Sequence, residues 1–347
     1  MGSASGEAMS RAADRAAKPT VMIYTMGEVI GDGVIKLPFA AAVREAFPDA
    51  WIVWCAGKGS TVYAGPLKTV VVGLIDEVLM TGRMGVRVSD HLFSPFGGRR
   101  FDLVIDTQGN FSRGLYARRA AKRFVSRVAG VHGLRRKPSD GQPPPIGMLD
   151  RLTDLLEIAA GRRVLPRPVA LTDPRTLAAA RVLLPDGPSY VGLAPGAGGQ
   201  EKRWPLARYL ELAERAKAAG HQPVLFFGPD EGADLDQARA AMPDALYPEF
   251  DRTDDFKDVR GPLLVIALAG RLAAAVANDA GPGHMLAAGG APLLSLQRTH
   301  WLAAKFKPSA PHLSLLVAED FGQGGMEAIP VEDAWLALQD LIAKPAP

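Results

Sequence analysis

The sequence predicts an α/β protein with two doubly wound domains, each built on a parallel sheet. Short β-branched or aromatic runs alternate with amphipathic stretches, which is the pattern of parallel strands covered by helices. This alternation occurs twice, on either side of a proline-rich segment at 165–188. The length of 347 residues and the hydrophobic content of 48% are sufficient for two cores of ordinary size.

The first half carries the signals of four strands and three helices. Runs rich in β-branched and aromatic residues predict strands at 21–26, 51–55, 77–80 and 103–106. Apolar residues at helical spacing predict helices at 39–46, 114–125 and 150–160. The segment 165–188 lacks strand signals, so it is interpreted as a linker with room for a helix at 174–184.

The second half repeats the pattern. Strands are predicted at 190–194, 223–227, 273–277 and 293–296, and helices at 206–219, 232–241, 263–269, 284–288 and 331–342. The resulting organisation is a disordered tail at 1–19, an N-terminal domain at 20–164, the linker at 165–188, a C-terminal domain at 189–325, and a C-terminal helix and tail at 326–347.

Composition favours a globular protein over a membrane or nucleic-acid-binding one. The net charge of +3 is too small to indicate nucleic acid by itself. The single cysteine, Cys55, excludes an internal disulfide and suits a cytoplasmic location. Gly270 and Arg271 interrupt the longest apolar runs, and the N-terminal tail lacks an apolar core. Neither a membrane span nor a signal peptide is therefore expected.

The most informative motif runs from Val276 to Ala288, where an apolar strand leads into Asp279, a glycine-rich turn and a helix. Glycine lets the backbone approach a ligand closely, and the first N–H groups of a helix have no internal partners. These features favour a phosphate site. The turn and helix start contain Ala280, Gly281, Gly283 and His284. The alternative is an ordinary strand-to-helix turn with a surface histidine.

A second candidate loop, from Gly27 to Pro38, follows the first predicted strand and carries two carboxylates. Asp32 could take a proton from a substrate hydroxyl, although an Asp that opens a helix is often only an N-cap. Glu28 is the reserve candidate for the base. The loop lacks Gly-x-Gly-x-x-Gly, so a dinucleotide site is not supported.

A third loop, after the strand at 190–194, combines flexible backbone with two cations. Gly196, Lys202 and Arg203 suit a diphosphate, because Lys offers a point charge and Arg a planar fork. Basic surface loops are common, which is the alternative interpretation. After the next strand, Glu231 could bind ribose hydroxyls, or could simply be an acid at a helix N-terminus.

These loops, in this order, resemble those of glycosyltransferase family 9, best known for the ADP-heptose:lipopolysaccharide heptosyltransferases. The resemblance covers about residues 20–330. In the first half it rests on Gly31-Asp32 with Pro38 six positions beyond the Asp, on Arg44-Glu-Ala-Phe47-Pro48, and on Asp106-Thr-Gln108-Gly109. In the second half it rests on the Pro-Gly-Ala loop with Lys202 and Trp204-Pro205, on Gly228-Pro-Asp-Glu231, and on Asn278-Asp279-Ala-Gly281-x-x-His284.

The resemblance implies an inverting GT-B glycosyltransferase, with two Rossmann-like domains facing a cleft, the acceptor domain first and the nucleotide-sugar domain second. It makes Asp32 the base that deprotonates the acceptor and Lys202 the cation that stabilises the leaving diphosphate. The implied contacts to the donor, ADP-heptose, come from Gly196, Lys202, Arg203, Glu231, Asp279, Ala280, Gly281, Gly283 and His284. The implied acceptor contacts are Gln108, Arg113, Arg119 and Lys122.

Neither a metal nor a cofactor is implied. The Asp234-Leu-Asp236 pair is interpreted as part of an exposed helix instead of a metal site. Ala280 and Gly33 depart from the family pattern, and Gln297-Arg298-Thr299-His300-Trp301 replaces its Gly-Pro-Thr-Asp-Pro segment. Arg298 and His300 become candidates for the contacts made there. A sugar-nucleotide epimerase and a non-catalytic nucleotide-sugar-binding protein stay open as alternatives, and the missing fingerprint disfavours a hydride-transfer enzyme.

A lipid-linked glycan acceptor, such as a lipopolysaccharide core, implies peripheral contact with the cytoplasmic face of the inner membrane. Basic pairs in the first half could contact its phosphates or anionic lipid, namely Arg99-Arg100, Arg118-Arg119, Lys122-Arg123 and Arg135-Arg136-Lys137. The spacing of the second and third pairs predicts one helix face, which could also be merely solvated. No nucleic-acid partner is expected.

Overall fold

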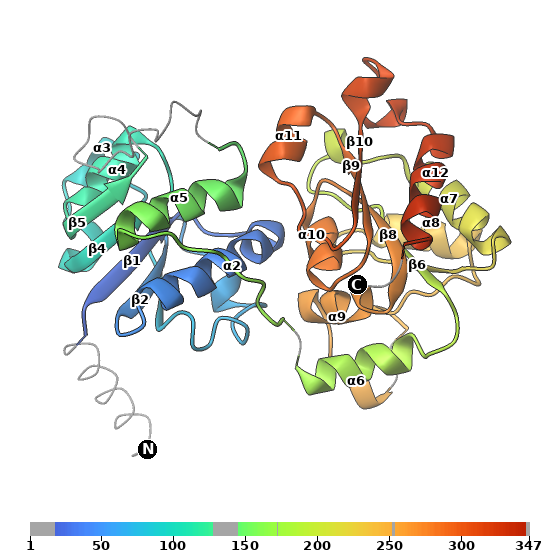
Figure 1. Cartoon of the computed structure of the whole chain (residues 1–347), viewed down its shortest axis with the longest axis horizontal. Coiled ribbons are helices and arrows are strands. Elements are labelled where there is room, and N and C mark those ends of the chain that lie inside the picture. Colours follow the sequence, from blue (N-terminus) through green and yellow to red (C-terminus); the bar gives the residue numbers. More distant parts are fainter. Residues whose placement is uncertain (1–17, 128–144, 172, 252–253, 345–347) are drawn as a thin grey trace. The chain divides into compact units, whose positions relative to one another are not determined.

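The computed structural model describes residues 18–127, 145–171, 173–251 and 254–344 (Figure 1). These residues form two compact units, the first from residues 18–29 and 36–169 and the second from residues 30–35 and 170–344. The predicted tail lies outside the described residues except for Lys18 and Pro19, and so does the basic run Arg135-Arg136-Lys137.

The first unit contains a five-stranded parallel sheet in the order β3-β2-β1-β4-β5. Its strands are β1 (Thr20–Thr25), β2 (Trp51–Ala56), β3 (Glu77–Met80), β4 (Phe101–Asp106) and β5 (Ala121–Ser126). In β1 and β2 every residue but the first is buried, as in a sheet covered on both faces, which explains their nearly continuous apolar sequences. The four strands predicted in this half are confirmed.

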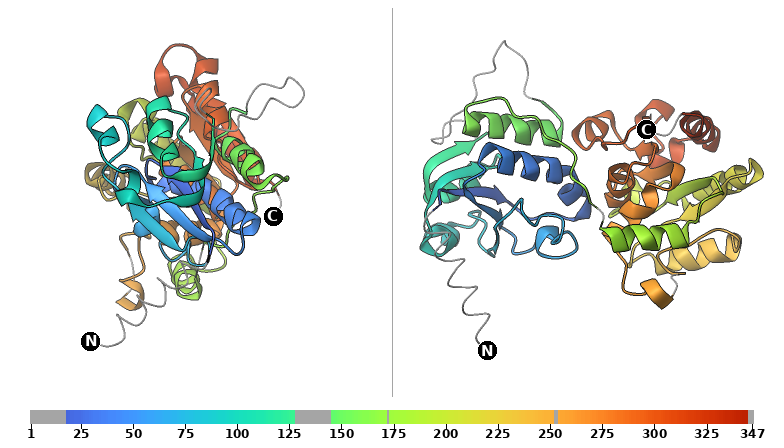
Figure 2. Two further views of the ribbon diagram at one scale, coloured as in Figure 1. Left: turned by 90° about the vertical axis from the view of Figure 1, so that its left-hand side faces the viewer. Right: turned by 60° about the horizontal axis from the view of Figure 1, so that its bottom comes forward.

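The helices of the first unit are α2 (Ile30–Ala46), whose residues 30–35 belong to the second unit, α3 (Val88–His91), α4 (Phe111–Arg118) and α5 (Met148–Ala160). Figures 1 and 2 show α2 and α5 beside each other over one face of the sheet. On the α4 side, the rings of Tyr24, Phe96, Phe101 and Tyr116 pack edge to face with centroids 5.4–6.0 Å apart. This aromatic cluster fixes α4 to the sheet.

α2 begins well before the predicted helix at 39–46, within the segment expected to be a loop. Two glycines and Pro38 lie inside it, and they cost roughly 1 kcal/mol each for glycine and about 3 kcal/mol for proline in a helix interior. Leu37 and Phe39 are fully buried, and burial of such side chains contributes about 1.5–3 kcal/mol each. Tertiary packing therefore outweighs the poor helix propensity.

β5 corrects the prediction of a single helix over 114–125. The helix α4 ends early, and the chain returns as a strand parallel to β4. In β5 only Lys122 and Arg123 are exposed, and a short amphipathic helix would show a similar pattern. Strand pairing decides between the two. The predicted helix face that combined these residues with Arg118 and Arg119 is therefore wrong.

The second unit contains another five-stranded parallel sheet, in the order β10-β9-β8-β6-β7. Its strands are β6 (Tyr190–Ala194), β7 (Gln222–Leu225), β8 (Leu272–Asn278), β9 (Leu293–Gln297) and β10 (Leu313–Val317). Its helices are α6 (Pro174–Leu183), α7 (Leu206–Ala218), α8 (Gly232–Ala241), α9 (Pro262–Ala269), α10 (Gly281–Ala288), α11 (His300–Lys305) and α12 (Val331–Ile342).

All strands and helices predicted for the second half are confirmed, and β10 and α11 are additional. β10 pairs only with β9, and four of its five residues are at least partly exposed, so its sequence gives no buried-strand signal. Two pairs of helices pack against the sheet: α7 with α12, and α9 with α10. The core beneath α12 includes Ala334, Leu338 and Leu341.

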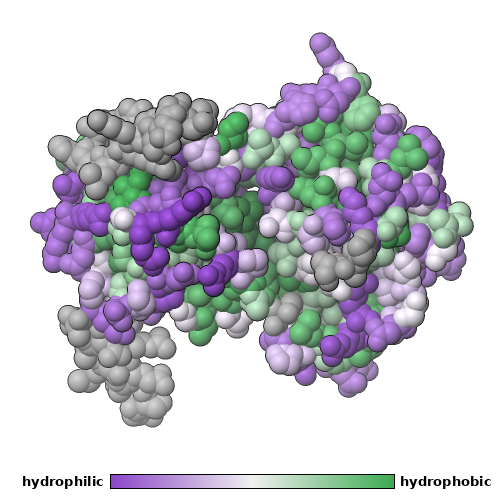
Figure 3. All heavy atoms as spheres, in the orientation of Figure 1, coloured by the Kyte–Doolittle hydropathy of each residue, from purple (hydrophilic) through white to green (hydrophobic). Residues whose placement is uncertain are grey.

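The surface of both units mixes polar and apolar side chains. Figure 3 shows hydrophobic residues among hydrophilic ones on the face drawn. Across the described residues, no helix has the length and apolar character needed to cross a bilayer.

Candidate functional site

The candidate loops lie at the switch points of the two sheets. In the second unit the chain passes from β6 to β7 on one side and then to β8 on the other, so β6 and β8 lie side by side. In the first unit β1 lies in the same way between β2 and β4. Ligands of open α/β sheets bind outside the carboxyl ends of strands at such points. The loops after β1, β4, β6 and β8 are therefore correctly placed for a ligand.

Asn278, the last residue of β8, joins the β6 loop to the β8 loop. Its side chain is buried; Nδ2 donates to the Pro195 carbonyl at 2.7 Å, and Oδ1 accepts from the Trp204 backbone N–H at 3.1 Å. The Trp204 indole is also buried and donates to the Ile329 carbonyl at 3.0 Å. Asn278 thereby holds both ends of the loop that carries Lys202. The sequence motif contains Asn278, but its bracing role depends on contacts distant in sequence.

Lys202 and Asp279 face each other in this brace. The Lys202 Nζ lies 3.6 Å from the Asp279 Oδ2, longer than a hydrogen bond. Asp279 is 6% exposed and its Oδ2 has no hydrogen-bond partner. Burial raises the pKa of Asp279, although the nearby charges of Lys202 and Arg298 lower it. The lysine thus has ammonium hydrogens left for a second anion.

The start of α10 provides backbone donors beside this pair. The N-cap residue is Ala280, which has no side-chain oxygen to satisfy the first N–H groups, and Pro282 has no N–H. The amides of Gly281 and Gly283 are therefore the donors of the first turn. Added bulk at Gly283 would press on the Asn278 carbonyl oxygen, because a Cβ there would lie 3.1 Å from it.

His284 completes the α10 turn as a neutral group. It is 6% exposed. Burial and the charge of Lys202 lower the pKa of His284 to about 4. At neutral pH its imidazole can donate one hydrogen bond to a phosphate oxygen but adds no positive charge. The positive charge of the site therefore comes from Lys202 and Arg298.

Arg203 acts inside the loop instead of pointing freely at a ligand. Its Nε and Nη2 donate to the Ala197 carbonyl at 3.1 and 3.0 Å, and its Nη1 lies 3.1 Å from the Asp234 Oδ2. Glu231 accepts from the Gly228 N–H at 2.7 Å and lies 3.8 Å from the Arg203 Nη2.

Gly196 is the point at which this arrangement leaves no space for a side chain. A Cβ on Gly196 would overlap the Glu231 carboxylate. The predicted donor residues Gly196, Arg203 and Glu231 thus lie together in the second unit, with Asp234 engaged by the arginine. Within the described residues, no group of three or more His, Cys, Asp or Glu side chains could hold a metal ion.

Arg298 and His300 differ in their surroundings. Arg298 is exposed after β9, and its charge lowers the pKa of Asp279, so it is near the Lys202–Asp279 pair. His300 is bound by the Asp320 carboxylate at 2.8 Å, while Thr299 caps α11. Arg298 is therefore the better placed of the two for a ligand at the α10 turn.

Asp32 is the third residue of α2, in the first part of that helix (30–35), which belongs to the second unit, and the N-cap position is occupied by Val29. The N-cap interpretation of Asp32 is therefore wrong. Its side chain is half-buried, and no described residue forms a hydrogen bond or ion pair with it. The reserve candidate, Glu28, is 5% exposed, and both of its carboxylate oxygens accept hydrogen bonds from neighbouring side chains. Asp32 has the carboxylate that is open to a substrate.

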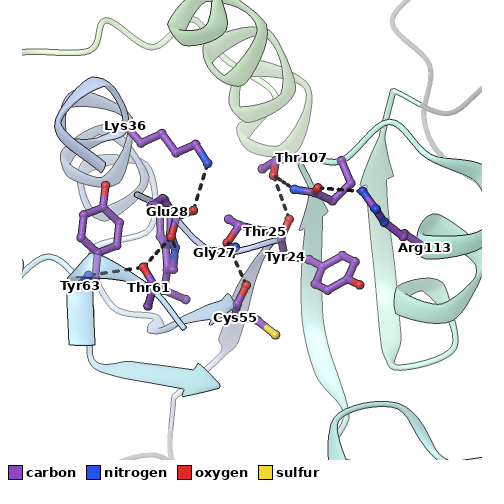
Figure 4. A network of polar contacts seen from close by, with 12 residues as sticks. Tyr24, Thr25, Gly27, Glu28, Lys36, Cys55, Thr61, Tyr63, Thr107 and Arg113 are labelled. Carbon is purple, nitrogen blue, oxygen red and sulfur yellow. Dashed lines mark hydrogen bonds and ion pairs between the residues drawn. The ribbon is translucent and has the colours of Figure 1, made fainter. Parts of the chain in front are cut away.

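The predicted acceptor residues separate into two groups. Gln108 follows β4, and its Oε1 lies 3.5 Å from an Nη1 of Arg113 at the start of α4 (Figure 4). Arg119 instead donates to the His91 carbonyl beyond the C-terminus of α4. Lys122 pairs with Asp102 at 2.7 Å near the start of β5. Lys122 is level with Asp102 in the sheet, four residues before the end of β4, so the rise of a strand puts it roughly 13 Å from the end of β4 that precedes Gln108.

Comparisons with known proteins were made for the sequence and for the structure. The model of a family described as glycosyltransferase family 9 (heptosyltransferase) matches residues 91–308. No match was found among curated protein sequences. The structure is similar to that of a glycosyl transferase family 9 protein from Veillonella parvula, with 17% identity, a TM-score of 0.67, and coverage of 94% of this chain and 97% of that one.

Two Escherichia coli structures are also similar. One is ADP-heptose lps heptosyltransferase II, with 18% identity, a TM-score of 0.60, and coverage of 93% of this chain and 98% of that one. The other is heptosyltransferase WaaC with ADP-2-deoxy-2-fluoro heptose, with 14% identity, a TM-score of 0.61, and coverage of 93% and 99%. These likenesses confirm the predicted fold of two parallel-sheet, Rossmann-like units.

Proposed function

The chain belongs to glycosyltransferase family 9, and on this basis we propose that it transfers heptose from ADP-heptose to a hydroxyl of a lipopolysaccharide core or a related lipid-linked glycan. The observation that carries the proposal is the anion site of the second unit. It combines the Lys202 ammonium, the first amides of α10 and the neutral His284, all at the sheet switch point. A nucleoside diphosphate is the ligand that this set suits best.

The proposed reaction is an inverting displacement. Asp32 accepts the proton of the acceptor hydroxyl, whose oxygen forms a bond to the anomeric carbon. The bond between that carbon and the diphosphate oxygen breaks, and the electron pair leaves with ADP. Lys202 and the α10 amides stabilise the charge that develops on the diphosphate, so the scheme requires no metal. Transfer requires both groups to act on one pair of substrates.

We expect ADP-heptose to raise the melting temperature more than UDP-, GDP- or CMP-linked sugars. Ligand at about 100 times its Kd stabilises a protein by about 2.7 kcal/mol, so the shift should grow with concentration. With the acceptor present, ADP should be released at the same rate with or without EDTA. Equal shifts by all nucleotide sugars would contradict the donor, and strict dependence on Mg²⁺ or Mn²⁺ would contradict the metal-free scheme. An epimeric sugar formed without acceptor would identify an epimerase instead.

The proposed lipid-linked acceptor also requires a surface that contacts a membrane. The segment Gly85–Phe93 lies against α4, since Ser112 donates to the Gly85 carbonyl and Arg119 to the His91 carbonyl. The exposed apolar residues on this segment and α4 are Val86, Val88, Leu92, Phe93, Phe111 and Leu115. The cations on or next to these elements are Arg83, Arg87, Arg113, Arg118 and Arg119, and the one acid on them, Asp90, is buried. Exposed apolar side chains with arginines on the same and adjoining segments suit an anionic bilayer.

We expect the protein to sediment with vesicles of phosphatidylcholine and phosphatidylglycerol, and less with phosphatidylcholine alone. Leu92→Glu should abolish this binding, because Leu92 is 80% exposed on the proposed surface. Val72→Glu is the matched control, since Val72 is 75% exposed elsewhere in the first unit. Equal binding of both variants would refute this surface. Concentration-dependent dimerisation that only Leu92→Glu abolishes would assign it to a second copy of the chain.

A further inference from the structure

A buried ion pair joins the turn before α2 to α2 itself, the helix that carries Asp32. The side chain of Glu28 is fully buried. Its Oε1 accepts from the Lys36 Nζ at 3.0 Å, and its Oε2 accepts from the Trp54 Nε1 at 3.1 Å and the Thr61 Oγ1 at 2.6 Å (Figure 4). A buried carboxylate is costly unless it is paired and hydrogen-bonded. This one has three donors, and only one of them is charged.

The backbone holds Glu28 in that position. Gly27 adopts φ +107°, and a Cβ there would overlap the Ser60 carbonyl oxygen. The Glu28 carbonyl accepts from the Val62 N–H at 3.2 Å. The segment after β2 thus contacts the turn between β1 and α2 at Gly27 and again at Glu28. These contacts keep the Glu28 carboxylate within hydrogen-bond distance of its donors.

Lys36 could form an ion pair with either of two carboxylates, Glu28 or Asp32. Asp32 and Lys36 are four residues apart on α2, which puts them on one helix face at ion-pair spacing. Long side chains on a helix lean towards its N-terminus, the end at which both Asp32 and the Glu28 partner of Lys36 lie. Among the described residues, however, the only partner of the Lys36 ammonium is Glu28.

We propose that Glu28 is a positioning residue that withholds the Lys36 ammonium from Asp32 and so keeps the Asp32 carboxylate open. A lysine paired with Asp32 would occupy the oxygen that must take the acceptor proton and would weaken that carboxylate as a base. The role of Glu28 in sugar transfer rests on the proposed function, in which Asp32 is the base. The competition of Glu28 and Asp32 for the Lys36 ammonium does not depend on that function.

The test is the Glu28→Gln substitution. The new amide oxygen can still accept from Trp54 and Thr61, but the amide nitrogen cannot accept from Lys36. Released from Glu28, the lysine is expected to pair with Asp32. In protein with ¹³C-labelled Asp carboxyls, the pH midpoint of the Asp32 signal should fall by about one unit. Asp32→Asn assigns this signal by removing it.

Two further variants separate the electrostatic role from a structural one. The Glu28→Gln/Lys36→Met double variant should return the Asp32 midpoint towards that of the wild type. Lys36→Met alone leaves the Glu28 charge unpaired, so it should raise the midpoint. Glu77→Gln is the matched control, because Glu77 also accepts from an arginine and a Trp51 indole, but on β3. It should leave the midpoint unchanged.

The same variants are assayed for ADP release from ADP-heptose with heptose-deficient lipopolysaccharide core as acceptor. Glu28→Gln should lower kcat on the order of tenfold, and the double variant should recover most of the loss. An Asp32 midpoint that does not move in Glu28→Gln, or a double variant that stays equally shifted, would overturn the proposal. If Glu28→Gln does not fold, an Asp32 midpoint that fails to rise in Lys36→Met overturns it. Shifted midpoints in an enzyme whose Asp32→Asn variant remains active would refute the base assignment alone.

Discussion

Asp32→Asn is expected to lower the rate of sugar transfer by a factor on the order of 10²–10⁴, the usual contribution of a general base. Asparagine matches aspartate in size, and the Asp32 side chain has no hydrogen bond or ion pair with a described residue that the change would break. Folding and ADP binding should therefore stay close to those of the wild type. The measurements are kcat from ADP release and Kd from calorimetry.

Asp49→Asn is the matched control for this change, because Asp49 is an exposed aspartate just beyond the C-terminus of α2. It should transfer sugar at the wild-type rate. Turnover near the wild-type rate in Asp32→Asn would reject Asp32 as the base. A Glu28→Gln variant that alone lost all activity would then move that role to Glu28.

Lys202→Ala is expected to lower kcat on the order of 10²–10³-fold, the range for removal of a donor that stabilises transition-state charge. It should also weaken ADP binding, because the Lys202 ammonium lies 3.6 Å from Asp279, the residue just before the α10 turn, and its charge acts on His284 in that turn. The loss of a partner for buried Asp279 will reduce stability as well, so binding is measured at a temperature at which the variant is folded. Lys202→Arg should recover part of the ADP affinity.

Lys217→Ala serves as the control for lost charge. Lys217 forms an exposed pair with Asp244 at 3.0 Å, also in the second unit. It should change neither ADP affinity nor kcat. An unchanged Kd for ADP in Lys202→Ala would place the diphosphate elsewhere, and Arg298→Ala would then be the next variant to measure.

The sequence predicted most strands because their signals are local. Continuous apolar runs such as Tyr190–Ala194 are buried on both faces and need no knowledge of their neighbours. The start of α2 could not be predicted in this way, since glycines and Pro38 oppose a helix and only packing favours it. The sequence did not predict β5 for the same reason, because the pairing of β5 with β4 depends on residues some twenty positions earlier.

In the candidate site, too, the features that are visible in the local sequence were predicted and the contacts between distant residues were not. Lys202, Asp279 and His284 were predicted because glycine-rich loops and charged residues are visible in the sequence, and the structure brings them together in the second unit. The brace formed by Asn278 was missed, since its partners lie 83 and 74 residues away. The burial of Glu28 was missed as well, because a carboxylate beside glycine gives no local sign of its donors.

The brace at Asn278 bears on the entropy of binding. Its amide bonds to Pro195 and Trp204 form within the protein, so the loop that carries Lys202 loses its conformational freedom when the chain folds. A ligand that meets a loop already ordered does not have to supply that entropy from its own contacts. The affinity for a diphosphate then depends on contacts at the α10 turn, and the second unit recognises it with a preorganised surface.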